Sequence, residues 1–104
     1  MLESYITKSI INYAKSKGFL TLKIAGGRYQ QPGISDIIAC SPQGLFVAIE
    51  VKTPAHTPSQ LQSSFLASVR ACNGVGAWVT DLRQAKVIID GILEYEATQQ
   101  SPSI

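Results

Sequence analysis

The run ISDIIACSPQGLFVAIEVK, residues 34–52, contains two apolar segments on either side of a turn. Ile34–Cys40 and Leu45–Lys52 are rich in β-branched residues, which favour strands. Between them, Pro42 suits the first central position of a type I turn, and Gly44 suits the left-handed position that follows it. The sequence therefore predicts a β-hairpin with a three-residue loop.

The length of that loop determines which residues face each other. A three-residue loop pairs Ser41 with Leu45 and sets Asp36 opposite Glu50, whereas a two-residue loop would put the two acids on opposite faces. Opposed carboxylates with Cβ atoms ~5 Å apart repel each other. A divalent cation offsets this repulsion, because Mg²⁺ takes one or two carboxylates and keeps its other positions for water and phosphate oxygens. The alternative is a surface ion cluster neutralised by Lys52.

Outside the hairpin, the spacing of apolar residues predicts three helices and two further strands. The predicted helices are 2–17, 58–72 with Thr57 as N-cap and Pro58 at its first position, and 82–96 after Asp81; the strands are 19–25 and 75–80. The last helix competes with a hairpin around Asp90-Gly91, and we favour the helix. The order αβββαβα predicts an α/β fold, a mixed sheet with helices on its faces.

The 104 residues suit one domain, predicted as 1–97 with a flexible polar tail at 98–104. No apolar run approaches the ~20 residues that span a bilayer, and no secretory signal is evident, so we expect a cytoplasmic location. Residues 1–57 carry six Lys/Arg against three acids, and residues 58–104 carry three against four. This excess fits a polyanion approaching the acidic pair, although charge alone favours the alternative of a solvated basic face.

At these residues the sequence resembles a known nuclease signature. Gly33-Ile34-Ser35-Asp36, followed by a strand that ends in Glu50-Val51-Lys52, looks like the PD-(D/E)XK pattern. Within that superfamily the chain is similar to the VRR-NUC domains found alone in phages and bacteria. The resemblance covers about residues 1–90 and includes a glutamate in the first helix and a glutamine after the lysine. It departs at Ser35, where the family usually has proline.

The resemblance implies a restriction-endonuclease-like fold and a DNA endonuclease dependent on Mg²⁺ or Mn²⁺. Asp36, Glu50 and the Val51 carbonyl would hold the metal, which polarises the scissile phosphate, and Lys52 would orient the attacking water. The standalone members imply a homodimer that cuts branched DNA, such as Holliday (four-way) junctions, in a bacterial or phage-infected cell. A flap or nicked-duplex nuclease and a catalytically silent nucleic-acid-binding module are the alternatives.

Two further site residues depend on the same resemblance. Glu3 lies on the core-facing stripe of the first helix, where it either joins the metal site or merely favours the helix N-terminus. Gln62 would hydrogen-bond the site or the phosphate, with Gln60 as the rival. Neither role follows from helical spacing alone.

DNA contacts are expected at the glycine-rich stretch 26–33. Lys23 lies just before this stretch and Arg28 within it, and both are expected to contact phosphates. Tyr29, also within it, could stack on a base. A plain solvated loop is the alternative. His56, the only histidine, has no second histidine or cysteine nearby in sequence and is expected to be a neutral surface residue.

Overall fold

The structure is a computed structural model, and it describes residues 2–24 and 32–99. Its elements follow the predicted order αβββαβα. They are α1 (Glu3–Ser16), β1 (Leu20–Lys23), β2 (Ile37–Cys40), β3 (Phe46–Val51), α2 (Gln60–Ala71), β4 (Val75–Val79) and α3 (Leu82–Thr98). The α/β class and the choice of a helix for the last segment are both confirmed.

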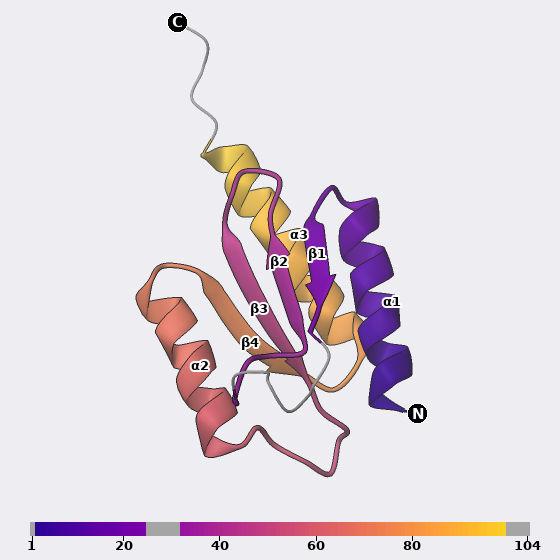
Figure 1. Ribbon diagram of the computed structural model, residues 1–104. Helices are drawn as coiled ribbons and strands as arrows, with labels where there is room; N and C mark the ends of the chain where they lie inside the picture. The colour runs from indigo at the N-terminus through magenta and orange to yellow at the C-terminus, as the bar shows by residue number, and fades with distance from the viewer. Residues whose placement is uncertain (1, 25–31, 100–104) are drawn as a thin grey trace, which may run out of the picture.

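The four strands form one mixed sheet in the order β1-β2-β3-β4. The first three strands are antiparallel neighbours, and β4 pairs parallel with β3 after the crossover through α2. Parallel neighbours need such a crossover because a tight hairpin can only reverse the chain. Figure 1 shows α2 alone on one side of the sheet, with α1 and α3 on the other.

The β2–β3 hairpin has the predicted register. Ser41 N–H donates to the Leu45 carbonyl at 2.9 Å, and Gly44 N–H closes the turn on the Ser41 carbonyl at 3.0 Å. Gly44 has a φ of +94°, the left-handed conformation that the sequence assigned to it. Ile37 then pairs with Ile49, so the residue before it lies across from Glu50.

Alternation along β3 divides the sheet into two unequal layers. Its odd-numbered residues pack with α1 and α3 in the main core, whereas Ala48 packs with Leu66 and Val69 of α2 in a smaller one. Gly76 lets α2 approach closely, because a Cβ there would stand 2.5 Å from the Leu66 carbonyl oxygen. The face that carries Ala48 and Glu50 is therefore the α2 face.

A buried polar contact joins the last helix to the hairpin. Ser41 Oγ donates to Oε2 of Glu96 near the end of α3 and accepts the Leu45 N–H. Both side chains are buried, so this contact fixes α3 against the turn of the hairpin.

The start of α2 differs from the prediction. Its N-cap is Ser59, and neither Thr57 nor Pro58 occupies the predicted position. Ser59 accepts the Gln62 N–H while the Gln62 side chain accepts the Ser59 N–H, so both backbone donors are satisfied. This capping box is available only with the helix beginning at Gln60.

The C-terminal end is described as far as Gln99. Helix α3 continues through Thr98, so the first two residues of the expected tail belong to the helix and its cap, and residues 100–104 lie outside the described residues. The cysteines of the described part, Cys40 and Cys72, are free thiols. None of the described helices is long and apolar enough to cross a membrane.

Candidate active site

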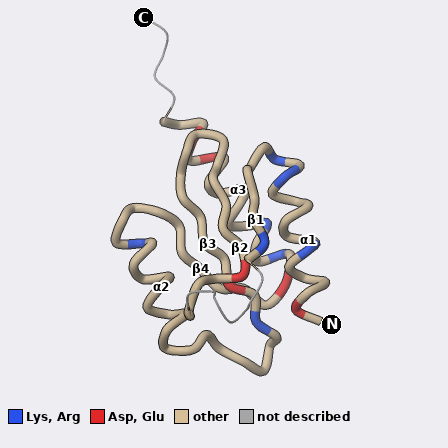
Figure 2. Tube along the Cα trace, in the orientation of Figure 1, with Lys and Arg blue, Asp and Glu red and all other residues tan. Residues whose placement is uncertain are grey.

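The predicted site residues meet where β3 ends. Asp36 immediately precedes β2, Glu50 and Lys52 lie at the end of β3, and Gln62 lies in the first turn of α2. Figure 2 shows acidic positions meeting where β2 begins and β3 ends, with basic positions along α1 and β1 on the neighbouring side. The antiparallel register and the α2 crossover together bring these residues to one end of the sheet.

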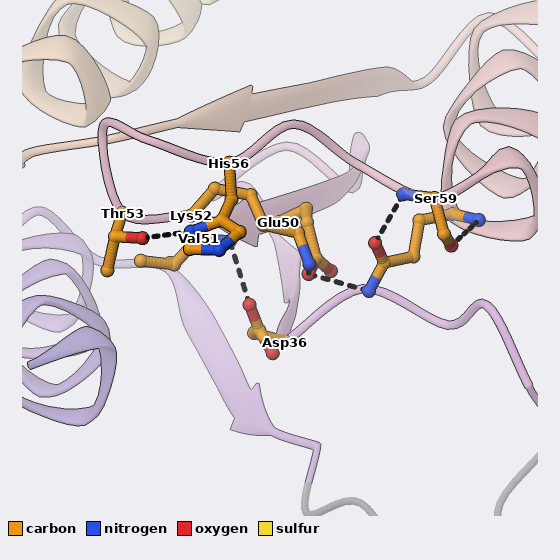
Figure 3. A network of polar contacts seen from close by, with 8 residues as sticks. Asp36, Glu50, Val51, Lys52, Thr53, His56 and Ser59 are labelled. Atoms are coloured by element: carbon orange, nitrogen blue, oxygen red, sulfur yellow. Dashed lines mark hydrogen bonds and ion pairs between the residues drawn. The ribbon is translucent and has the colours of Figure 1, made fainter.

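Asp36 is anchored to β3 by its side chain. Its Oδ2 accepts the Val51 N–H at 2.8 Å, and its own carbonyl accepts the Ile24 N–H at 2.8 Å. Figure 3 shows the carboxylate pointing toward Val51 with Glu50 beside it. Ser35 is buried and donates to the Ile37 carbonyl at 3.1 Å. Its hydroxyl is therefore satisfied, and the chain still enters β2 with Asp36 at the site.

The Glu50 carboxylate is buried, with only 2% of the residue exposed. Its Oε2 pairs with Lys52 Nζ at 3.3 Å and accepts from Gln62 Nε2 at 2.9 Å. Its Oε1 is buried and has no hydrogen-bond partner among the described residues. A buried acceptor without a partner is costly, so this oxygen, like Thr21 Oγ1 and Glu96 Oε1 elsewhere in the fold, has an unused capacity to bind a donor or a cation.

The environment of Glu50 disfavours its charged form. Burial, followed by repulsion from Asp36, raises its pKa from the ordinary 4.5 to about 7, while the nearby Lys52 ammonium acts in the opposite direction. Glu50 is therefore poised between its protonated and ionised forms near neutral pH. A cation brought close to its carboxylate would favour the ionised form.

These oxygens suit a hard divalent cation such as Mg²⁺. Glu50 Oε1 has no partner, and the Asp36–Val51 contact uses only one oxygen of Asp36. The N–H and C=O of a strand residue point to the same edge, so the Val51 carbonyl also faces the side of Asp36. The donor set therefore fits the metal, with two carboxylates and one carbonyl converging on one end of β3.

Gln62 links the site to the helix start. Its Oε1 accepts the Ser59 N–H at 2.8 Å, while its Nε2 donates to Glu50. The capping box thereby fixes the side chain that holds Glu50 in place. The rival, Gln60, is an exposed first residue of α2.

The structure does not bring Glu3 into this cluster. Within residues 2–24 and 32–99, no three His, Cys, Asp or Glu side chains gather closely enough to hold one ion. Glu3 instead lies in the first turn of α1, where a carboxylate favours the positive end of the helix dipole. The spacing of seven residues from Ile10 put Glu3 on the core-facing stripe, and its side chain is half-buried there.

The predicted DNA contacts are only partly described. Lys23 ends β1 and is exposed, whereas Arg28 and Tyr29 lie outside the described residues. His56 is exposed in the loop after Lys52, and its Nδ1 lies 2.7 Å from Thr53 Oγ1.

Sequence reasoning overlooked Trp78. It pairs with Glu50 across the parallel β3–β4 ladder and is 43% exposed. Its being the only tryptophan in the chain was a visible signal, but the register of a parallel pair cannot be read from a turn.

The fold is similar to one found in a solved structure of a VRR_NUC domain. The two chains are 20% identical and superpose with a TM-score of 0.69, over 89% of this chain and 95% of the other. At that identity the likeness shows the fold. No protein-family model matches the sequence, and no curated protein matches it either.

Proposed function

We propose that this protein is a metal-dependent nuclease that hydrolyses DNA at the site formed by Asp36, Glu50 and Lys52. The observation that carries the proposal is the buried Glu50 carboxylate, whose Oε1 has no partner among the described residues although a second carboxylate lies beside it. Such an arrangement costs folding free energy, and a bound cation offsets that cost. The fold shared with a VRR_NUC domain supports the nuclease class.

Each residue has a distinct role in this proposal. A divalent cation held by Asp36, Glu50 and the Val51 carbonyl would polarise the scissile phosphate and make a water molecule more acidic. Lys52 neutralises part of the acidic pair, orients the attacking water and offsets charge that develops on the phosphate. Gln62 occupies Glu50 Oε2 and so leaves Oε1 directed at the cation.

The experiment is cleavage of a DNA panel with Mg²⁺ or Mn²⁺, with and without EDTA. The panel holds four-way junctions, flaps, nicked duplex, linear duplex and single strands. Cleavage that needs the metal and disappears in Asp36→Asn and Glu50→Gln supports the proposal. DNA binding without cleavage of any substrate would instead support the catalytically silent module.

We further propose a homodimer that cuts four-way junctions by paired nicks. One copy presents a small basic surface, whereas a two-fold pair presents two sites to two strands. A candidate interface is the apolar groove between the edge strand β4 and α3. It is lined by Leu45, Val75, Val87, Ile88, Ile92 and Tyr95, among others.

Sedimentation tests the dimer, and Val87→Glu tests the groove. Val87 is 70% exposed, so the added charge should leave the monomer folded but separate the two copies. A wild-type monomer at micromolar concentration, with equal activity on linear duplex and junction, would remove both parts of this proposal.

A further inference from the structure

A row of side chains crosses the α2 face of the sheet at the level of the acidic pair. Glu50 pairs with Trp78 on the neighbouring strand, and residues in register on adjacent strands project to the same face. Gly76 of β4 and Gly74 just before it fix which face this is, because a Cβ at either position would meet atoms of α2. Trp78, two residues after Gly76, therefore stands on the same face as Glu50.

Packing of α2 locates Trp78 along the sheet as well. Gly74 lies against Val69 and Gly76 against Leu66, so the helix runs opposite to the strand. Trp78 lies about 6.6 Å farther along the strand than Gly76. Leu66 lies opposite Gly76, and Gln62 is four residues, or about 6 Å, back along α2 from Leu66. Trp78 is therefore level with Gln62, the residue that holds Glu50.

The exposure of Trp78 is unusual for its position. Tryptophan is highly buried on average, yet 43% of this residue is exposed on the edge strand. The spacing of ~4.8 Å between neighbouring strands puts the backbone of Trp78 within about two nucleotide steps, of ~3.4 Å each, of the backbone of Glu50. An accessible aromatic surface thus borders the site where a phosphate would bind.

We infer that Trp78 is a stacking platform for an uncovered DNA base next to the phosphate that would bind at Asp36 and Glu50. A base inside a duplex is covered on both faces by its neighbours, so an indole can stack only on a base at an end, a flap or a branch point. Trp78 therefore favours DNA whose bases are uncovered at this position, as at an end, a flap or the branch point of a four-way junction. The inference rests on the proposed function only in taking DNA as the ligand.

The test uses the only tryptophan of the chain as its own probe, without cleavage. Asp36→Asn protein in EDTA is titrated with a labelled flap and with a labelled linear duplex, and anisotropy and tryptophan fluorescence are recorded together. We expect the flap to quench the fluorescence as it binds and the duplex to quench it much less. Binding of the flap without quenching would overturn the inference.

Variants separate stacking from packing. Trp78→Leu should weaken flap binding about tenfold, the scale of one base–aromatic stack, while Trp78→Phe keeps most of the affinity. Phe46→Leu is the matched control, because Phe46 is also exposed on the α2 face but lies at the opposite end of β3. Equal losses for Trp78→Leu and Trp78→Phe would assign Trp78 a packing role and overturn the inference.

The outcomes also distinguish this inference from the proposed function. If flap DNA quenches the fluorescence and Trp78→Leu binds the flap more weakly, but the protein cleaves nothing in Mg²⁺, the stacking role of Trp78 is supported and the nuclease proposal is refuted. If the protein shows metal-dependent cleavage but its Trp78→Leu variant binds the flap normally, the nuclease proposal is supported and the stacking role is refuted. Absence of DNA binding by anisotropy would overturn both.

Discussion

Asp36 accepts the N–H of Val51 through Oδ2 at 2.8 Å, so the carboxylate before β2 is anchored on the strand that carries Glu50. The contact continues the hairpin beyond its last backbone pair by means of a side chain. The contact holds the two acids together, with Glu50 buried, and their carboxylates repel each other. A bound cation would relieve this repulsion.

Removing either charge should abolish cleavage and leave the fold at least as stable. Asp36→Asn keeps an oxygen that can accept the Val51 N–H, and Glu50→Gln keeps one for Gln62, so the contacts survive while the repulsion disappears. We expect loss of DNA cleavage, with an unfolding free energy that is unchanged or higher by about 1 kcal/mol. Cleavage assays and urea unfolding measure the two effects, and undiminished cleavage by either variant would refute the site.

Stability without metal should fall as the pH rises from about 4.5 to 7. The pKa of Glu50 is about 7 in the folded protein against 4.5 ordinarily, so the folded state holds the extra proton between these values. Its stabilising contribution is complete below pH 4.5 and is lost as the pH rises through 7. The change is on the order of 3 kcal/mol, and thermal unfolding in EDTA measures it.

Glu50→Gln is the control for this pH dependence, because it removes the titrating group and should flatten the profile over the same range. Mg²⁺ should raise the melting temperature of the wild-type protein more at pH 8 than at pH 5, because the ion competes with the proton for Glu50. An equal effect of Mg²⁺ at both values would place the metal elsewhere.

Replacing Lys52 should affect turnover more than binding. Its ammonium is 3.3 Å from Glu50 and its side chain is only 18% exposed, so it is held at the site. Lys52→Met keeps the apolar stem and should lower the cleavage rate of bound DNA by ~10²-fold or more, with a small change in DNA affinity. Single-turnover cleavage and anisotropy separate the two. Lost binding with normal turnover would make Lys52 a phosphate contact only.

Gln62 and Gln60 offer a matched pair in one helical turn. Gln62→Ala removes a hydrogen bond to Glu50 and half of the capping box, so we expect about 1 kcal/mol less stability and a cleavage rate lower by about tenfold. Gln60→Ala should change neither quantity, because that side chain is exposed. A loss of stability and cleavage in Gln60→Ala but not in Gln62→Ala would show that Gln60, and not Gln62, supports the site.

Gly33 should be intolerant of a side chain for two reasons. Its φ is +89°, and a Cβ there would lie 2.8 Å from the Leu61 carbonyl oxygen in the first turn of α2. Gly33→Ala should therefore cost about 1–3 kcal/mol and also displace Gln62, lowering cleavage. Gly44→Ala is the control, since Gly44 has a similar φ of +94° but open space around it. It should destabilise the hairpin with little effect on the activity of the folded protein.

Local chemistry explains what could be predicted from the sequence. Pro42 and Gly44 specified the loop, the loop specified the register, and the register placed Asp36 near Glu50. The predicted N-cap of α2 was wrong because Pro58 also suits a first helical position. Only the reciprocal hydrogen bonds of Ser59 and Gln62 decide that the helix begins at Gln60.

Long-range pairings could not be predicted in this way. The parallel ladder that sets Trp78 beside Glu50 depends on how α2 packs over the sheet, which no local signal encodes. The same holds for the contact between Ser41 and Glu96, residues at distant points of the chain. Their buried polar atoms are evident only once the helices are in place.

The hairpin turn has a consequence for how a gene encoding this chain can change. The turn lies at the far end of β3 from the acidic pair, yet any change in it that shifts the pairing of the two strands by one residue would reverse the alternation of every later residue in the strand. Glu50 would then enter the apolar layer under α1 and α3, and an apolar neighbour, Ile49 or Val51, would lie opposite Asp36 in its place. Changes at this turn are therefore tolerable only where Ser41 still pairs with Leu45.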